Sequence, residues 1–272
     1  MTQIGDWKYT YASVMGTSHQ KVNTPCQDSS KSQVIEDSKG EKVLVAVVSD
    51  GAGSAKFSDQ GSSLACSLFL KEVTKYLSID KVIKDLGKVF IENWLDTFQA
   101  EILSLANDLE VPIREFACTF LAAVVGNDYA AFFQVGDGAI VLLDTEPESP
   151  EENYKWIFWP DKGEFENTTY FITDPKVKKR IKIDDLHRSV DEISLFTDGI
   201  QHLTLHYQTQ TVHNPFFKPM FNVLRKAERD NQDQLNSSLA KFLNSERVNE
   251  KTDDDKTLLL ATRRGVENLG IE

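Results

Sequence analysis

The 272-residue sequence lacks long apolar runs, and no stretch approaches the roughly 20 apolar residues that a membrane helix needs. Its opening residues, MTQIGDWKYTYAS, contain no basic segment followed by an apolar core, so they do not resemble a signal peptide. We therefore expect a cytoplasmic protein that makes no contact with a membrane.

Cysteine is also scarce. Cys26, Cys66 and Cys118 are odd in number and too far apart for a zinc motif, which favours small buried side chains in a reducing compartment. There is no Gly-x-Ser-x-Gly motif and no Walker loop, which argues against a serine hydrolase and a P-loop enzyme.

Positive charge is in deficit. The 30 Lys and Arg residues face 42 Asp and Glu residues, and the formal net charge is −12. Nucleic acid is therefore a disfavoured partner, because a phosphate backbone binds to basic surfaces. The excess of carboxylates is instead compatible with a site that gathers them to hold cations.

What is present is typical of a soluble globular chain, 40% hydrophobic and 26% charged. We expect helices where apolar residues recur with a period of 3.6, and strands where apolar runs are short. The predicted helices cover residues 59–77, 83–107, 216–229 and 232–244. The predicted strands cover residues 8–15, 43–49, 116–126, 129–136, 139–144, 192–200 and 257–263, with a possible further strand at 154–160.

Two details of this pattern are specific. The helix at 83–107 is expected to bury Val89, Trp94, Phe98, Ile102 and Leu105. The three runs between 116 and 144 are separated by GND and GDG, which are hairpin signals and predict an antiparallel meander rather than βαβ units. The stretch 16–30 is expected to be a loop, and 145–153 an acidic loop.

Aspartate recurs at the ends of apolar strands, as Asp50, Asp137, Asp198 and the pair Asp254 and Asp255. A single Asp-Gly has an ordinary explanation as a turn or helix cap. The group as a whole does not, because carboxylates brought together raise one another's pKa and repel. A divalent cation removes that cost, and oxygen ligands without His or Cys favour Mg²⁺ or Mn²⁺. Two such ions are the machinery of phosphate ester hydrolysis.

The chain then resembles the metal-dependent protein serine/threonine phosphatases of type 2C. The segments that carry the resemblance span residues 11–262 in the family's order: PCQDSS, SDGAGS, ACTFLAAVV, VGDGAIVLLD, FTDGI and DDKTLLLAT. The resemblance implies an α+β fold in which two packed antiparallel β-sheets are flanked by helices, a four-layer αββα sandwich. It implies a single domain over 1–272 with a flap insertion around 145–190, and hydrolysis of phosphoserine and phosphothreonine in proteins by a metal-activated water.

The resemblance also assigns roles to residues. Asp50 corresponds to the carboxylate that bridges two Mg²⁺ or Mn²⁺ ions, and Gly51 would offer its carbonyl. Asp28 would act at the site through water and is grouped with Asp50 as catalytic. The remaining implied metal ligands are Asp198 and Asp254 at the first ion and Asp137 at a third, weaker site, with Asp255 as the alternative to Asp254. A phosphoprotein substrate is implied, and a kinase or von Willebrand-type A domain protein is a suggested partner.

The chain departs from the family pattern at residues that are expected to bind the substrate phosphate. The arginine that the family places five residues before the loop aspartate is replaced by Asn23, and His19 and Lys21 are the nearby candidates for binding the phosphate, although each reads equally well as a solvated loop side chain. The alternative to an active enzyme is a catalytically weak pseudophosphatase that binds a phosphoprotein or a regulator. An assay with p-nitrophenyl phosphate, with and without Mn²⁺, separates the two.

Three further motifs have ordinary explanations. HLTLH places His202 and His206 four residues apart, but no Glu stands between them and a zinc pair is disfavoured. The basic run KVKKRIKI is expected to be a solvated face. The aromatic segment YKWIFWP is expected to belong to the core or to a flap.

Overall fold

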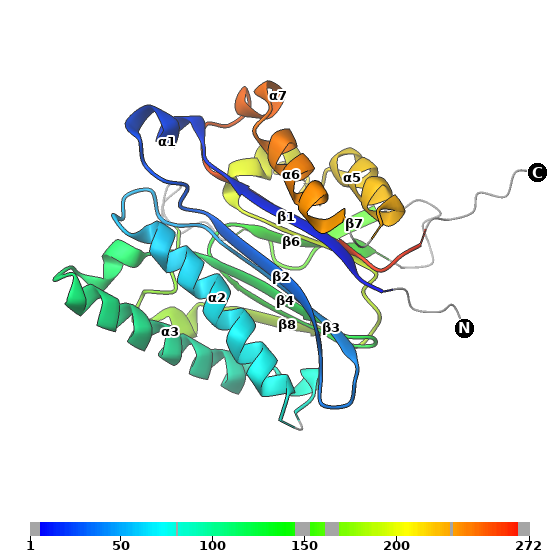
Figure 1. The fold of residues 1–272 in the computed structure, drawn as a ribbon, viewed down its shortest axis with the longest axis horizontal. Helices are drawn as coiled ribbons and strands as arrows, with labels where there is room; N and C mark the ends of the chain where they lie inside the picture. Colours follow the sequence, from blue (N-terminus) through cyan, green and yellow to red (C-terminus); the bar gives the residue numbers. More distant parts are fainter. Residues whose placement is uncertain (1–5, 80, 145–152, 161–168, 229–230, 266–272) are drawn as a thin grey trace, which may run out of the picture.

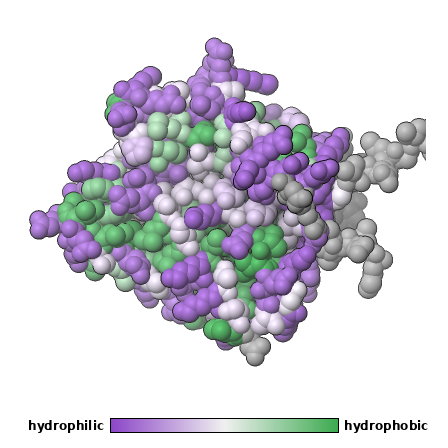
Figure 2. Space-filling model, in the orientation of Figure 1, coloured by the Kyte–Doolittle hydropathy of each residue, from purple (hydrophilic) through white to green (hydrophobic). Residues whose placement is uncertain are grey.

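The computed structural model describes residues 6–79, 81–144, 153–160, 169–228 and 231–265. Two five-stranded sheets lie face to face, and helices cover the outer face of each (Figure 1). This is the four-layer α+β sandwich that the sequence predicts. The predicted acidic loop at 145–153 falls almost entirely outside the described residues. Hydrophilic residues cover much of the face in Figure 2, and apolar ones gather in separate patches.

Every neighbouring pair of strands within the two sheets is antiparallel. The first, here the β1 sheet, has the order β1 (Lys8–Val14), β12 (Lys256–Thr262), β9 (Glu192–Phe196), β6 (Ala139–Asp144) and β7 (Asn153–Trp156). The second, the β2 sheet, has the order β2 (Ser29–Glu36), β3 (Lys42–Ser49), β4 (Phe120–Val125), β5 (Ala130–Val135) and β8 (Lys182–Leu186). A small hairpin joins β10 (Leu205–His206) to β11 (Thr211–Val212).

The long helices divide between the two outer faces. α2 (Ser58–Leu77) and α3 (Lys88–Asp108) cover the β2 sheet, and α5 (Asn214–Lys226) and α6 (Gln232–Leu243) cover the β1 sheet. The short helical segments are α1 (Thr17–Val22), α4 (Gln201–Thr204), α7 (Glu246–Asn249), η1 (Ile83–Asp85), η2 (Ile113–Phe116), η3 (Val177–Lys179) and η4 (Asp198–Ile200).

Strand β3 is apolar at every position from Val43 to Val48, and its surroundings explain why. Val43, Val45 and Val47 point to the layer of α2 and α3, whereas the alternate residues Leu44 and Ala46 point into the core between the sheets. A strand covered on both faces has no polar side, so it reads as a continuous run. The prediction that both faces of 43–49 are covered is confirmed.

The predicted helix 83–107 is divided by Gly87 into η1 and α3. Trp94, Phe98 and Ile102 are buried as expected, but Val89 is 74% exposed and Leu105 is 36% exposed. The prediction for these two residues is wrong. Val89 lies about 200° around the helix from the buried Ile91, and Ala106 rather than Leu105 continues the buried stripe.

The prediction of a three-stranded meander is wrong at its last turn. β4 and β5 form a hairpin in the β2 sheet, but β6 pairs with β7 and β9 in the β1 sheet. The GDG sequence therefore carries the chain from one sheet to the other. Gly136 has φ +103°, and a Cβ there would lie 2.6 Å from the Thr119 side chain, so glycine is required at the crossing.

The region 16–30 is not wholly a loop, since it contains α1 and the start of β2. Cys66 and Cys118 are buried and Cys26 is partly exposed, and all three are free thiols. None of the helices that the structure describes has the length and apolar character to cross a bilayer.

Candidate active site

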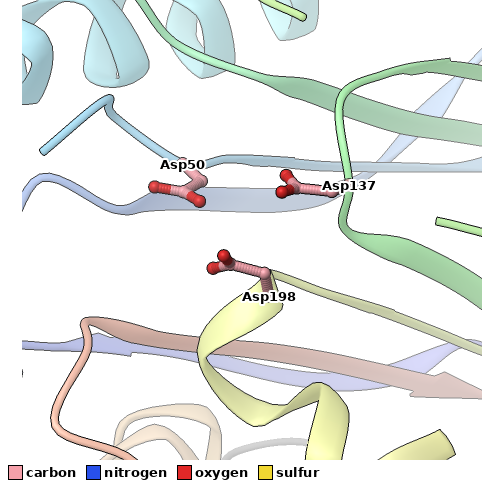
Figure 3. Close-up of side chains that lie close together, drawn as sticks. All are labelled: Asp50, Asp137 and Asp198. Atoms are coloured by element: carbon pink, nitrogen blue, oxygen red, sulfur yellow. The ribbon is translucent and has the colours of Figure 1, made fainter. Parts of the chain in front are cut away.

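Three carboxylates converge at one end of the sandwich, between the two sheets. Asp50 follows β3, Asp198 follows β9, and Asp137 lies in the crossing between β5 and β6. One oxygen from each lies within 4.8 Å of the others, and Figure 3 shows the three side chains pointing toward a common space. β3 and β9 belong to opposite sheets, so the carboxylates meet across the sandwich rather than along one sheet.

The backbone around Asp50 is held by Thr119, the residue that precedes β4. The amide of Asp50 donates to Thr119 Oγ1 at 2.9 Å, and the amide of Thr119 donates to the Asp50 carbonyl at 2.7 Å. Gly51 lies so close to other chain segments that a Cβ would be 2.7 Å from the Gln27 carbonyl oxygen and 2.8 Å from that of Ser58. Glycine after Asp50 is therefore a packing requirement, and it lets the backbone pass beside the site.

Asp28 is a buried carboxylate with one oxygen satisfied and one not. Its Oδ2 accepts hydrogen bonds from the hydroxyls of Thr197 and Thr257, both at 2.8 Å. Its Oδ1 has no hydrogen-bond partner among the described residues. Burial raises the pKa of Asp28 to about 8, with a smaller contribution from Asp255, although the two threonines oppose the shift. An unsatisfied buried oxygen is costly, so this atom calls for a cation or a water.

The adjacent residues Asp254 and Asp255 differ in their contacts. The buried carboxylate of Asp255 accepts the amides of Gly16 and Gln27, each at 2.6 Å, and lies 2.9 Å from Nδ1 of His19. It therefore ties the N-terminal segments to the start of β12. Asp254 accepts the amide of Asp255 through Oδ1, while Oδ2 accepts no hydrogen bond from a described residue. Asp254 is the member of the pair with an oxygen to spare.

The charges of the site oppose one another's ionisation. Burial raises the pKa of Asp50 well above the ordinary range, and the negative charges of Asp28 and Asp198 add to the effect. Burial also raises the pKa of Asp198 to about 7, together with Asp137 and Asp254. The ammonium of Lys256, itself fully buried, donates to the Asp254 carbonyl at 3.2 Å and offers partial compensation behind the site.

These residues fit a divalent metal. The donor set is made of carboxylate oxygens, which suit Mg²⁺ and Mn²⁺ rather than a soft ion. A cation would meet the spare oxygen of Asp28 and offset the repulsion that raises the carboxyl pKa values.

The pocket around the carboxylates has a volume of about 560 Å³. Its lining includes Asp50, Asp137, Asp198, Asp254, Asp255, Gly51, Gly53, Ser54, His19, Gln27, Thr169, Phe171, Gln201, His202 and Tyr207. No lysine or arginine in the described part of the chain lines it. His19 is the one predicted substrate-binding residue in the wall. Lys21 and Asn23 are exposed and outside it, and Asn23 adopts φ 57° as the cap of α1.

Several residues of the site give little signal in the sequence. Gln201 donates to the Asp137 carbonyl and accepts the hydroxyl of Tyr207, so it links the Asp137 crossing to the β10–β11 hairpin. Nothing local marks this pair. Thr197 and Thr257 do carry a signal, since each lies at one end of an apolar strand within two residues of an aspartate, but their common target Asp28 is distant in sequence.

The two histidines of HLTLH do not form a helical pair. His202 belongs to α4 and lines the pocket, whereas His206 lies in β10 and contacts His213, with 2.9 Å between ring nitrogens. The basic run spans η3 and the start of β8, and the aromatic segment begins in β7.

Comparison with known proteins bears on the whole chain. The model of the family described as protein phosphatase 2C matches residues 15–244. The chain is 36% identical over 258 residues to serine/threonine-protein phosphatase 3 of Escherichia coli strain K12, which covers 94% of this chain and 98% of that protein.

Solved structures share the fold at low identity. The serine-threonine phosphatase 2C of Toxoplasma gondii has a TM-score of 0.61 at 12% identity and covers 96% of both chains. The structure of RsbX in complex with magnesium has a TM-score of 0.52 at 13% identity, covering 96% of this chain and 99% of that one. At such identities the likeness shows the fold alone.

Proposed function

The chain belongs to the protein phosphatase 2C family and is a protein serine/threonine phosphatase, and we propose that it hydrolyses phosphoserine and phosphothreonine with two bound Mg²⁺ or Mn²⁺ ions. The observation that carries the metal dependence is the convergence of Asp50, Asp137 and Asp198 within 4.8 Å. The RsbX structure, of the same fold, is one in complex with magnesium, which supports the choice of ion.

The ligands follow from the atoms that face the pocket. The charges of Asp28, Asp198, Asp137 and Asp254 all act on Asp50, so we assign Asp50 as the carboxylate that would bridge two ions, with the carbonyl of Gly51 as a further ligand. Asp198 and Asp254 would hold one ion, and Asp137 would hold a further, weaker one. Asp255 is occupied with two backbone amides and is assigned a structural role.

Divalent ions at such a site lower the pKa of bound water and neutralise the charge of the phosphoryl group. The residues of this chain supply the rest. Oδ1 of Asp28 has no hydrogen-bond partner among the described residues and would accept a hydrogen bond from a bound water, while the hydroxyls of Thr197 and Thr257 donate to Oδ2 and fix the carboxylate. Thr119 and Gln201 hold the backbones of Asp50 and Asp137 so that the two carboxylates stay in register.

The substrate phosphate would meet little positive charge from side chains. His19 and His202 are the described side chains in the wall that can carry a positive charge, and Ser54 adds a hydroxyl. A guanidinium binds phosphate through charge-assisted bidentate hydrogen bonds, and among the described residues no such group lines this pocket. We therefore expect weak binding of small phosphate esters, with a correspondingly high KM.

The test measures turnover and metal binding on the same protein. Hydrolysis of p-nitrophenyl phosphate and of a phosphothreonine peptide is followed in EDTA, Mg²⁺ and Mn²⁺, and Mn²⁺ binding is measured by calorimetry. Asp198→Asn should weaken both activity and Mn²⁺ affinity, because it removes one charged ligand. The matched control is Asp108→Asn, a change of the same kind at an exposed position on α3.

Turnover in EDTA equal to that in Mn²⁺ would refute the metal dependence. Unchanged Mn²⁺ affinity in Asp198→Asn would remove Asp198 from the ligand set. Failure to hydrolyse either substrate in any metal would favour the pseudophosphatase alternative, in which the site binds a phosphoprotein without turning it over.

A further inference from the structure

Helix α5 carries two apolar stripes, although packing against the sheet requires one. The stripe that is buried over the β1 sheet consists of Phe217, Phe221 and Leu224. The second stripe has the same i, i+4, i+7 spacing one residue earlier and consists of Phe216, Met220 and Val223. It is only partly covered, and Val223 is 64% exposed. Phe216 and Met220 pack against the edge of the same apolar cluster but stay partly exposed, so the second stripe leaves apolar area in water in the isolated domain.

Helix α6 presents a matching stripe. Its members repeat at the same spacing and are Leu235, Leu239 and Phe242. The rings of Phe216 and Phe242 lie 6.1 Å apart, and all six residues of the two stripes line one common hollow. Between them lies an apolar groove of about 630 Å³, which Leu260 of β12 also lines.

Two cations stand at the α7 side of this groove. Arg247 and Lys251 line it, are exposed, and have no ion-pair partner among the described residues. The neighbouring Glu246 and Glu250 do not line it. In a chain with a net charge of −12, two unpaired cations beside an apolar groove form a local site that complements carboxylates.

The dimensions suit a helix. α5 and α6 contain 13 and 12 residues, so the groove between them is about 18 Å long, roughly three helical turns. The groove is open to solvent on one side, as the exposed Pro215, Pro219 and Val223 show. A thin acyl chain would leave these residues wet, whereas a helix about 10 Å wide would cover both stripes.

We propose that this groove binds an amphipathic helix of a partner protein. The helix presents apolar side chains at i, i+3 or i+4, and i+7 to the two stripes, and it carries Asp or Glu at the end that meets Arg247 and Lys251. The interaction is separate from hydrolysis of the phosphate ester, because none of the carboxylates of the catalytic pocket lines the groove.

The first experiment identifies what the groove selects. The full chain is immobilised and used to select from a displayed library of random peptides of roughly 16 residues, long enough for four helical turns. Counter-selection uses Val223→Glu, which places a carboxylate in the groove at an exposed position. The peptides enriched on the unmodified chain should show the i, i+3/i+4, i+7 apolar pattern with Asp or Glu at one end.

The second experiment tests the charges. Arg247→Glu with Lys251→Glu should weaken the best peptide about tenfold or more, and a peptide with Lys in place of its acidic residues should recover binding to that variant. Leu103→Glu, an equal change at a 52% exposed site on α3, should leave the affinity unchanged. Hydrolysis of p-nitrophenyl phosphate confirms that each variant is folded.

The proposal fails if no peptide is enriched over the Val223→Glu counter-selection, or if enriched peptides lack the acidic end. It also fails if charge reversal leaves the affinity unchanged. Binding of dodecanoate that Val223→Glu abolishes, with no peptide enriched, would assign the groove to a lipid-like carboxylate and would overturn the proposal.

Discussion

The catalytic pocket and the groove between α5 and α6 are hollows of similar volume, about 560 and 630 Å³, with opposite linings. The pocket holds carboxylates that burial and mutual repulsion keep from ionising easily, and the groove leaves apolar side chains in water. Each arrangement costs free energy in the isolated chain. We therefore expect different occupants in the two hollows, a divalent cation in the pocket and an apolar surface in the groove.

The largest difference between a substitution in the pocket and one in the groove is expected in kcat. Asp50→Asn should lower kcat by about 10³-fold or more, because no other carboxylate can take over the bridging role proposed for Asp50. Val223→Glu, which changes the groove, should leave kcat unaltered. Both are measured with p-nitrophenyl phosphate in Mn²⁺. Near-normal turnover in Asp50→Asn would break the assignment of the pocket.

The metal-free protein should lose stability as pH rises. An unfolded Asp has a pKa near 3.9, whereas in the folded state the pKa of Asp28 is raised to about 8 and that of Asp198 to about 7. The folded state therefore binds more protons between these values, so stability that is present near pH 4 is lost progressively toward pH 8.

Thermal unfolding in EDTA across this range measures the effect. Mn²⁺ should reduce the loss at pH 7 and above, because it binds the ionised carboxylates of the folded state. Val223→Lys in the groove should not change the pH dependence. A melting temperature in EDTA that rises from pH 5 to 8 would contradict the electrostatic account of the pocket.

Asp255→Asn tests whether Asp255 stabilises the fold. The substitution removes a charged acceptor of two backbone amides and turns an amide donor toward one of them, so we expect about 2 kcal/mol of destabilisation. Urea unfolding without metal reports it, and Asp253→Asn at the exposed neighbouring position is the control. Equal stability in the two variants would return Asp255 to the list of metal ligands.

The smallest effect is expected in KM, through the binding of the substrate phosphate. His19→Ala should raise KM for p-nitrophenyl phosphate about tenfold, because a hydrogen bond to a charged group contributes about 1.5 kcal/mol at the lower end of its range and about 1.4 kcal/mol is a factor of ten. Lys21→Ala lies two residues away, outside the pocket, and should leave KM unaltered. The contrast between the two variants is the measurement. If both leave KM unchanged, the α1 segment does not contact the substrate.

Much of the fold could be predicted because buried positions recur as apolar residues at regular spacing in the sequence. β3 and α2 were recoverable from apolar spacing alone, since each packs along its whole length. The errors arose where spacing is ambiguous. GDG is a hairpin signal, yet Gly136 with φ +103° turns the chain toward the other sheet, and a short-range pattern cannot report which sheet receives the next strand.

That acidic residues stand at the ends of buried strands follows from the sequence alone, because Asp-Gly borders an apolar run at Asp50, Asp137 and Asp198, and Asp254 and Asp255 directly precede another. The sequence also determined the order of these segments, from which the family could be recognised. Only the tertiary structure decided which oxygens are available. Asp254 and Asp255 are neighbours of identical chemistry, but the amides of Gly16 and Gln27 reach only one of them, and contacts between segments more than 200 residues apart leave no local pattern.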